Sequence, residues 1–142
     1  MKKPVFVDGH IYHVYNRGVE KRDEFLNEGD YYRFVHHLYE LNNSKPVRNV
    51  QYFLNHKSGN VEARKLFGIQ KRDVLVEILV FTLMPNHFHL MLRQLKENGI
   101  VRFMQKLGTG YTMYFNKKYE RVGCLFQGPF KAVHIIEEAH LV

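Results

Sequence analysis

Residues 82–92 read TLMPNHFHLML, a turn followed by a strand that carries two histidines. Pro85 and Asn86 are typical turn residues. Alternate side chains of a strand share a face, so we expect His87 and His89 to project together from one side of a sheet. The residues expected to point into the core from the other side are Phe88, Leu90 and Leu92. Two imidazoles on a rigid strand form half of a divalent metal site, although nine histidines in the chain also allow a simple solvated pair.

Hydrophobic periodicity predicts four strands and two long helices. The strands are expected at residues 10–17, 74–83, 87–93 and 130–135, and the helices at 31–41 and 100–116. Asp30 is the predicted N-cap of the first helix. The order strand, helix, strand, strand, helix, strand predicts an α+β fold, the ferredoxin-like βαββαβ sandwich, in which helices cover one face of an antiparallel sheet.

The charge of the chain favours a polyanionic partner. The 142 residues carry a net charge of +7, a length that suits one domain. Residues 44–72 hold seven Lys/Arg against one Glu, and residues 100–136 hold six against one. Such basic segments are typical of nucleic-acid binding, and the first of them is interpreted as an inserted arm. The single cysteine, Cys124, cannot form an internal disulfide and fits the cytoplasm, and no apolar run is long enough to span a membrane.

The histidine segment, with its His-hydrophobic-His (HUH) motif, resembles the signature of the IS200-like (Y1) tyrosine transposases, most closely the REP-associated branch. Further segments resemble that family in the family's order. They are YHVYNRG at 12–18, DYYRF at 30–34, YFNKKY at 114–119 and GCLFQGPFK at 123–131. The resemblance covers most of the chain outside residues 43–72 and implies the same fold, with the first strand and the histidine strand at the centre of the sheet.

The resemblance also implies a chemistry. In the family, a divalent metal ion, Mg²⁺ or Mn²⁺, is held by the residues that match His87 and His89, and it polarises a phosphate of single-stranded DNA. A tyrosine attacks this phosphate, forms a 5′-phosphotyrosine and releases a 3′-hydroxyl, so the strand can later be rejoined. That tyrosine lies on a helix after the last strand, beyond Val142 in this chain, and residues 137–142 resemble the start of the helix. We therefore expect the 142 residues alone to lack the usual nucleophile, with Tyr114 as the first choice among substitutes.

Several further residues are candidates for the site. Glu77, inside the apolar strand at 74–83, could supply an oxygen ligand if it faces the histidines. A mixture of basic and aromatic side chains suits single-stranded nucleic acid. The residues predicted to contact it are Arg17, Lys106, Tyr111, Lys117, Lys118, Arg121 and Lys131.

Three functions remain open from the sequence. The first is a DNA transposase domain that cleaves and rejoins single-stranded DNA with a hairpin, or a REP-like repeat, as partner. The second is a catalytically inactive homologue that binds a DNA or RNA hairpin. The third is a zinc-dependent hydrolase, for which a third histidine or cysteine at a recognisable spacing is missing. Relatives with this signature include dimers that share active sites, so a homodimer is compatible with the resemblance.

Overall fold

The fold is built on one antiparallel sheet with the strand order β2-β3-β1-β4. The strands are β1 (Ile11–Arg17), β2 (Val76–Met84), β3 (His87–Gln94) and β4 (Lys131–Ile135). The structure is a computed structural model that describes residues 2–46 and 72–136. Most of the arm predicted at 44–72, and the helix start predicted at 137–142, lie outside these residues. The order confirms that the first strand and the histidine strand are central.

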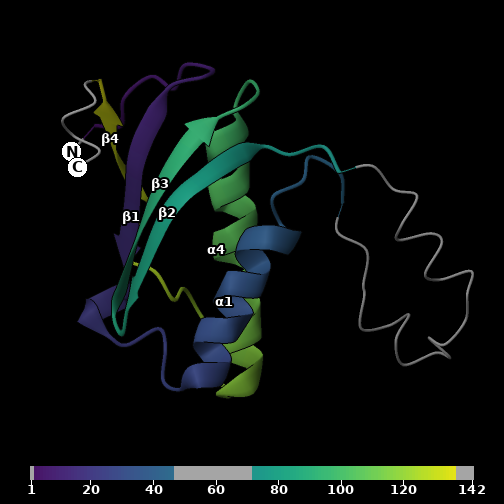
Figure 1. The fold of residues 1–142 in the computed structure, drawn as a ribbon. Coiled ribbons are helices and arrows are strands. Elements are labelled where there is room, and N and C mark those ends of the chain that lie inside the picture. The colour runs from purple at the N-terminus through teal and green to yellow at the C-terminus, as the bar shows by residue number, and fades with distance from the viewer. Residues whose placement is uncertain (1, 47–71, 137–142) are drawn as a thin grey trace, which may run out of the picture.

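Two helices, α1 (Glu28–Glu40) and α4 (Gly99–Lys118), lie on the same side of this sheet (Figure 1). A short 3₁₀ turn, η1 (Val19–Lys21), follows β1. No helix of the described residues covers the other face, which we call the open face. The arrangement confirms the predicted ferredoxin-like α+β fold.

The core lies between the helices and the sheet because both contribute a regular apolar stripe. Phe88, Leu90 and Leu92 alternate along β3 and are buried, as predicted. On α4, side chains at intervals of four residues occupy one face of the helix. The buried members of that stripe are Phe103, Leu107, Tyr111 and Phe115. Each large apolar side chain buried in this way contributes about 1.5–3 kcal/mol to folding.

The first helix begins three residues earlier than predicted, and Asp30 is not its N-cap. The cap is Asn27, whose side-chain oxygen accepts a hydrogen bond from the backbone N–H of Asp30 at 3.2 Å. Asp30 lies in the first turn and is buried, and its carboxylate accepts from the backbone N–H of Leu26 at 2.9 Å. Asn27 thus satisfies a backbone N–H group that the helix start leaves free, and Asp30 fixes the residue before the cap.

The turn before the histidine strand is fastened to the connection between β1 and α1. The backbone N–H of Gly18 donates to the carbonyl oxygen of Asn86 at 3.0 Å. The N–H groups of Glu24 and Phe25 both donate to the carbonyl oxygen of Pro85, at 2.8 and 3.2 Å. These contacts fix the start of β3, and therefore the position of its first histidine.

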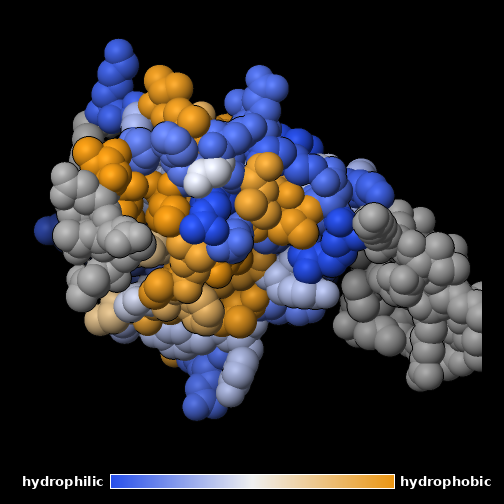
Figure 2. All heavy atoms as spheres, turned by 45° about the horizontal axis from the view of Figure 1, so that its top comes forward, coloured by the Kyte–Doolittle hydropathy of each residue, from blue (hydrophilic) through white to orange (hydrophobic). Residues whose placement is uncertain are grey.

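Apolar and polar side chains lie next to one another on the face shown in Figure 2. Among the described residues, no helix combines the length and the apolar character that a membrane span needs.

Candidate metal and nucleic-acid site

The two histidines of β3 project from the open face of the sheet. Their neighbours Phe88 and Leu90 point to the helices and are buried, whereas His87 and His89 are partly exposed. The ring centroids of the two histidines are 5.1 Å apart, and their planes are nearly perpendicular, at 88°. The pair therefore has the arrangement that strand alternation predicts, and its binding of a metal ion stays a prediction.

Each histidine has a polar neighbour at one ring nitrogen. Nδ1 of His87 lies 2.8 Å from Oδ1 of Asn86. Nδ1 of His89 lies 2.8 Å from Nε2 of His13, a residue of β1. Burial lowers the pKa of His89, and the nearby His13 and His87 lower it further. Burial likewise lowers the pKa of His13. The imidazoles of His13 and His89 therefore favour the neutral form.

A cavity of about 400 Å³ lies beside the two histidines. The register of the strands explains its lining, because Tyr15 pairs with His89 and Arg17 pairs with His87 across β1 and β3. On the other side, Lys131 of β4 pairs with Tyr15. The residues that line the cavity are Tyr15, Asn16, Arg17, His87, His89 and Lys131. Two side-chain cations thus adjoin the histidine pair, which suits an anionic ligand.

Among the basic residues predicted to bind nucleic acid, Arg17 and Lys131 lie at this cavity, whereas others stabilise the helical layer. Lys106 donates to the carbonyl oxygens of Asn43 and Lys45, at 2.5 and 3.0 Å. Arg121 donates to Asn116 Oδ1 at 2.6 Å and to the carbonyl oxygen of Cys124 at 3.1 Å. Lys117 is exposed at the end of α4.

The tyrosines and the remaining lysine of α4 also lie in the helical layer. Tyr111 is buried and donates its hydroxyl hydrogen to the carbonyl oxygen of Glu24, so it presents no surface to nucleic acid. Tyr114 donates to one oxygen of the Asp30 carboxylate at 2.7 Å, and Lys118 donates to the same oxygen at 2.8 Å. These side chains hold the end of α4 against the start of α1.

The position of Tyr114 conflicts with a role as nucleophile. It lies on α4, with the sheet between it and the histidines, and burial together with its hydrogen bond to Asp30 raises its pKa. A nucleophile must reach the phosphate that the metal ion polarises, and Tyr114 faces away from it. Tyr114 is therefore not retained as the candidate nucleophile.

Glu77 lies on the same open face as the histidines, but its side chain pairs with Arg93 and not with them. Its carboxylate accepts a hydrogen bond from Arg93 at 2.8 Å, and the two residues are paired across β2 and β3. Arg93 is four residues beyond His89, about 13 Å along the strand. Within residues 2–46 and 72–136, no cluster of three or more His, Cys, Asp or Glu side chains is placed to hold a metal ion.

Tyr15 and Asn16 line the cavity but were not predicted from the sequence. The ring of Tyr15 lies against both His13 and His89, with ring-centroid distances of 5.1 and 5.7 Å. The signal was present in the alternation of β1, which places His13, Tyr15 and Arg17 on one face. The same alternation places Asn16 on the helix side, where its amide donates to the carbonyl oxygen of Gly128 at 3.1 Å.

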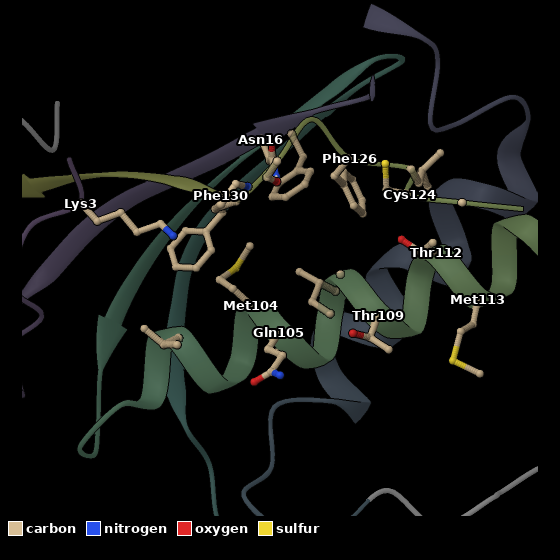
Figure 3. A pocket seen from close by; sticks show the side chains of 18 residues that line it. Lys3, Asn16, Met104, Gln105, Thr109, Thr112, Met113, Cys124, Phe126 and Phe130 are labelled. Carbon is tan, nitrogen blue, oxygen red and sulfur yellow. The ribbon is translucent and has the colours of Figure 1, made fainter. Parts of the chain in front are cut away.

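A larger cavity, of about 720 Å³, lies between α4 and residues 123–130 (Figure 3). Met104 and Met113 of α4 lie along one side, and Phe126 and Phe130 lie along the other. The ammonium group of Lys3 lies 4.1 Å from the ring centroid of Phe130. Because the lining is mainly apolar, this cavity offers less to a phosphate than the smaller one beside the histidines.

Comparisons with known proteins agree with the fold. The family model described as "Transposase IS200 like" matches residues 10–135. A solved structure of a REP-associated tyrosine transposase bound to a REP hairpin is similar, with a TM-score of 0.55 and 11% sequence identity. The match covers 99% of this chain and 65% of that one, so this chain spans less than two thirds of its length.

A second similar structure comes from Deinococcus radiodurans R1 and is described as that of a candidate transposase. Its TM-score is 0.50 and its sequence identity 14%, and the match covers 99% of this chain and 91% of that one. No curated protein matches the sequence. At such low identities the two structures support the fold alone.

Proposed function

Because the chain belongs to the IS200-like transposase family, we propose that it binds single-stranded DNA with a hairpin and cleaves and rejoins one strand. The observation that carries this proposal is the cavity on the open face, where His87 and His89 adjoin Arg17 and Lys131. Imidazoles are suitable ligands for a divalent metal ion, and paired side-chain cations are suitable for a phosphodiester. The similar structure that is bound to a REP hairpin supports the choice of a hairpin as partner.

The donors at the cavity fit a divalent metal ion such as Mn²⁺ or Mg²⁺. Both histidines project from the central strand β3, whose start is fixed by the hydrogen bonds to Pro85 and Asn86, and a rigid support of this kind preorganises ligands. When bound, the ion would neutralise the negative charge that develops on the scissile phosphate. Imidazole ligands favour Mn²⁺ over Mg²⁺, while the abundance of Mg²⁺ in cells makes it a competitor.

The residues around the histidines would bind and orient the DNA. Arg17 and Lys131 would contact phosphate oxygens on either side of the scissile bond. Tyr15 offers the flat surface of its ring to a base, because base–aromatic stacking is the usual means of holding single strands. A strand held at three points leaves little freedom for the phosphate, which lowers the entropic cost of reaction.

The proposed reaction is an exchange of one phosphate ester for another. A tyrosine oxygen loses its proton and bonds to phosphorus, while the bond from phosphorus to the 3′ oxygen breaks. The departing oxygen takes up a proton and becomes a 3′-hydroxyl, and the protein keeps a 5′-phosphotyrosine. The covalent bond stores the energy of the original ester, so rejoining needs no ATP.

The test is a search for this adduct in the whole protein. Single-stranded DNA hairpins, labelled at the 5′ or the 3′ end, are incubated with protein and Mn²⁺ and separated on a denaturing protein gel. We expect a label that stays with the wild-type protein and is lost in His87→Ala and His89→Ala. His36→Ala removes an exposed histidine of α1 and is the matched control, which should retain the adduct. Mass spectrometry of the adduct identifies the tyrosine.

Other outcomes would overturn the proposal. Tight binding of a hairpin without any adduct, equal in wild-type and His87→Ala proteins, would identify a hairpin-binding module instead. This second function is compatible with the finding that, within the described residues, His87 and His89 belong to no cluster of three or more His, Cys, Asp or Glu side chains placed to hold a metal ion. Stoichiometric Zn²⁺ with hydrolysis of small esters would identify a hydrolase.

A further inference from the structure

The two histidines of the site are both engaged through the same ring atom. Nδ1 of His87 faces Asn86 and Nδ1 of His89 faces His13, in each case at 2.8 Å. Each contact has the length of a hydrogen bond. The Nε2 atoms of His87 and His89 are therefore the ring atoms left for a metal ion.

The contact of His87 defines which of its nitrogens carries the hydrogen. The side-chain oxygen of Asn86 can only accept, so Nδ1 of His87 must donate. In a neutral imidazole the other nitrogen, Nε2, then has a free lone pair, as a metal ligand requires. Asn86 thus prepares His87 for coordination through Nε2.

His13 is placed to do the same for His89. The centroids of the two rings are 5.0 Å apart and their planes differ by 22°, so the two nitrogens meet edge to edge, close to the plane of both rings. That is the direction in which an imidazole nitrogen donates or accepts. His13 does not line the cavity itself, which suits a residue that acts on a ligand from behind.

The strands and a neighbouring ring hold His13 in this position. Tyr15 pairs with His89 across β1 and β3, so His13 is the diagonal neighbour of His89 on the open face. The ring of Tyr15 packs against His13 at 5.1 Å, with an angle of 30° between the planes. Both contacts limit the rotation of the His13 side chain.

We propose that His13 is a positioning residue, which accepts a hydrogen bond from Nδ1–H of His89 and so directs Nε2 of His89 toward the metal ion shared with His87. The inference rests on the proposed function, because it assumes that His87 and His89 bind metal. Partners of this kind fix the tautomer and orientation of metal-binding histidines, and their loss weakens metal binding about 10–100-fold.

The first test needs no metal. In protein labelled with ¹⁵N-histidine, a two-bond ¹H–¹⁵N correlation spectrum reports which nitrogen of each ring is protonated. We expect the Nδ1–H tautomer for His89 in the wild-type protein and a mixture of tautomers in His13→Ala. In His13→Gln, the side-chain oxygen can accept in place of the imidazole, so the Nδ1–H tautomer should return.

The second test measures the affinity for Mn²⁺ by titration with electron paramagnetic resonance. His13→Ala should weaken binding about 10–100-fold, while His13→Gln should stay close to the wild type. The matched control is His10→Ala, because His10 lies just before β1 and contacts His134 instead of the site. A His89 that carries its hydrogen on Nε2, or an unchanged Mn²⁺ affinity in His13→Ala, would overturn the inference.

The two proposals fail in different ways. If the wild-type protein takes up no Mn²⁺, the metal site of the proposed function is wrong. If the wild-type protein binds Mn²⁺ and His13→Ala binds it equally well, the metal site stands and the role of His13 is wrong. Because His13→Gln keeps a polar side chain of similar length, it decides the question even if His13→Ala folds poorly.

Discussion

Glu24 is a buried acid whose ionisation lowers the stability of the fold at neutral pH. Its side chain is fully buried, and within the described residues neither carboxyl oxygen has a hydrogen-bond partner. Burial, with a smaller contribution from Asp23, raises its pKa from 4.5 to about 9. The unfolded chain therefore releases the proton of Glu24 at a lower pH than the folded protein does. The folded protein therefore loses stability, relative to the unfolded chain, as the pH rises from about 4.5 toward 9.

Replacing this carboxyl group should stabilise the protein at neutral and alkaline pH. Glu24→Gln has no ionisation to suppress, so we expect its free energy of unfolding at about pH 8 to exceed that of the wild type by on the order of 5 kcal/mol. The difference should shrink as the pH falls to 4.5 and vanish below it, where both states of the wild type become protonated. Urea unfolding at the two pH values measures it. If the free energy of unfolding of Glu24→Gln differed from that of the wild type by the same amount at both pH values, the raised pKa of Glu24 would be contradicted.

Asp30 shows that burial alone does not decide the sign of such an effect. Burial would raise its pKa, but hydrogen bonds from Lys118, Tyr119 and Tyr114, and from the backbone of Leu26, lower it to about 2. Its contribution to stability is therefore present above its ordinary pKa of 3.8 and is lost as the pH falls toward about 2. The two buried acids thus give the protein opposite responses to pH because only one of them has donors.

At the scale of elements, the connection between β1 and α1 depends on a glycine that tolerates no side chain. A Cβ atom on Gly18 would lie 2.1 Å from the carbonyl oxygen of Arg22. The same residue donates its N–H to Asn86, in the turn before the histidine strand. We expect Gly18→Ala to lower the free energy of unfolding by about 2 kcal/mol, a typical cost of overpacking, as measured by urea unfolding.

The control for this substitution is Gly108→Ala, in α4. A Cβ atom there meets nothing within 4 Å, and alanine is favoured over glycine inside a helix by about 1 kcal/mol. Gly108→Ala should therefore leave the stability unchanged or raise it. If Gly18→Ala were as stable as Gly108→Ala, the close contact with Arg22 would not constrain the connection.

The elements themselves were largely predictable because their periodicity reflects which side is buried. Alternation in β3 correctly separated Phe88, Leu90 and Leu92 from the histidines. The N-cap was assigned wrongly to Asp30, because Asn27 and Asp30 are both good capping residues and only the tertiary contacts of Asp30 distinguish them. The bonds that fasten Gly18 to Asn86 join residues distant in sequence, and no local pattern reports them.

The candidate site was less predictable because composition does not indicate which face a charge occupies. Arg17 and Lys131 were predicted and lie at the cavity, since Arg17 is on β1, beside the histidine strand, and Lys131 is on β4, the next strand along. Tyr111 was predicted as a DNA contact but continues a four-residue apolar stripe of α4, a pattern that already indicated burial. His13 and Tyr15 gained their importance only from the register of β1 against β3.

At the scale of the whole molecule, the net charge of +7 does not say where DNA binds, because basic side chains occur on both layers. The proposed function puts the DNA on the open face of the sheet, at the histidine cavity, and the salt dependence of binding can test this. Each phosphate contact with a single strand contributes about 0.7 to the slope of log affinity against log salt concentration. Arg17→Ala and Lys131→Ala should each reduce that slope by about 0.7, as measured by fluorescence anisotropy with a labelled hairpin.

The exposed Lys117, at the end of α4, provides the comparison for this measurement because it carries the same charge on the helical layer. Lys117→Ala changes the net charge as much as Lys131→Ala does, so a non-specific effect of charge would reduce both slopes equally. We expect the slope of Lys117→Ala to match that of the wild type. A larger reduction in Lys117→Ala than in Arg17→Ala would mean that the DNA lies across the helices, away from His87 and His89, and the histidine cavity could then not be the place where the strand is cleaved.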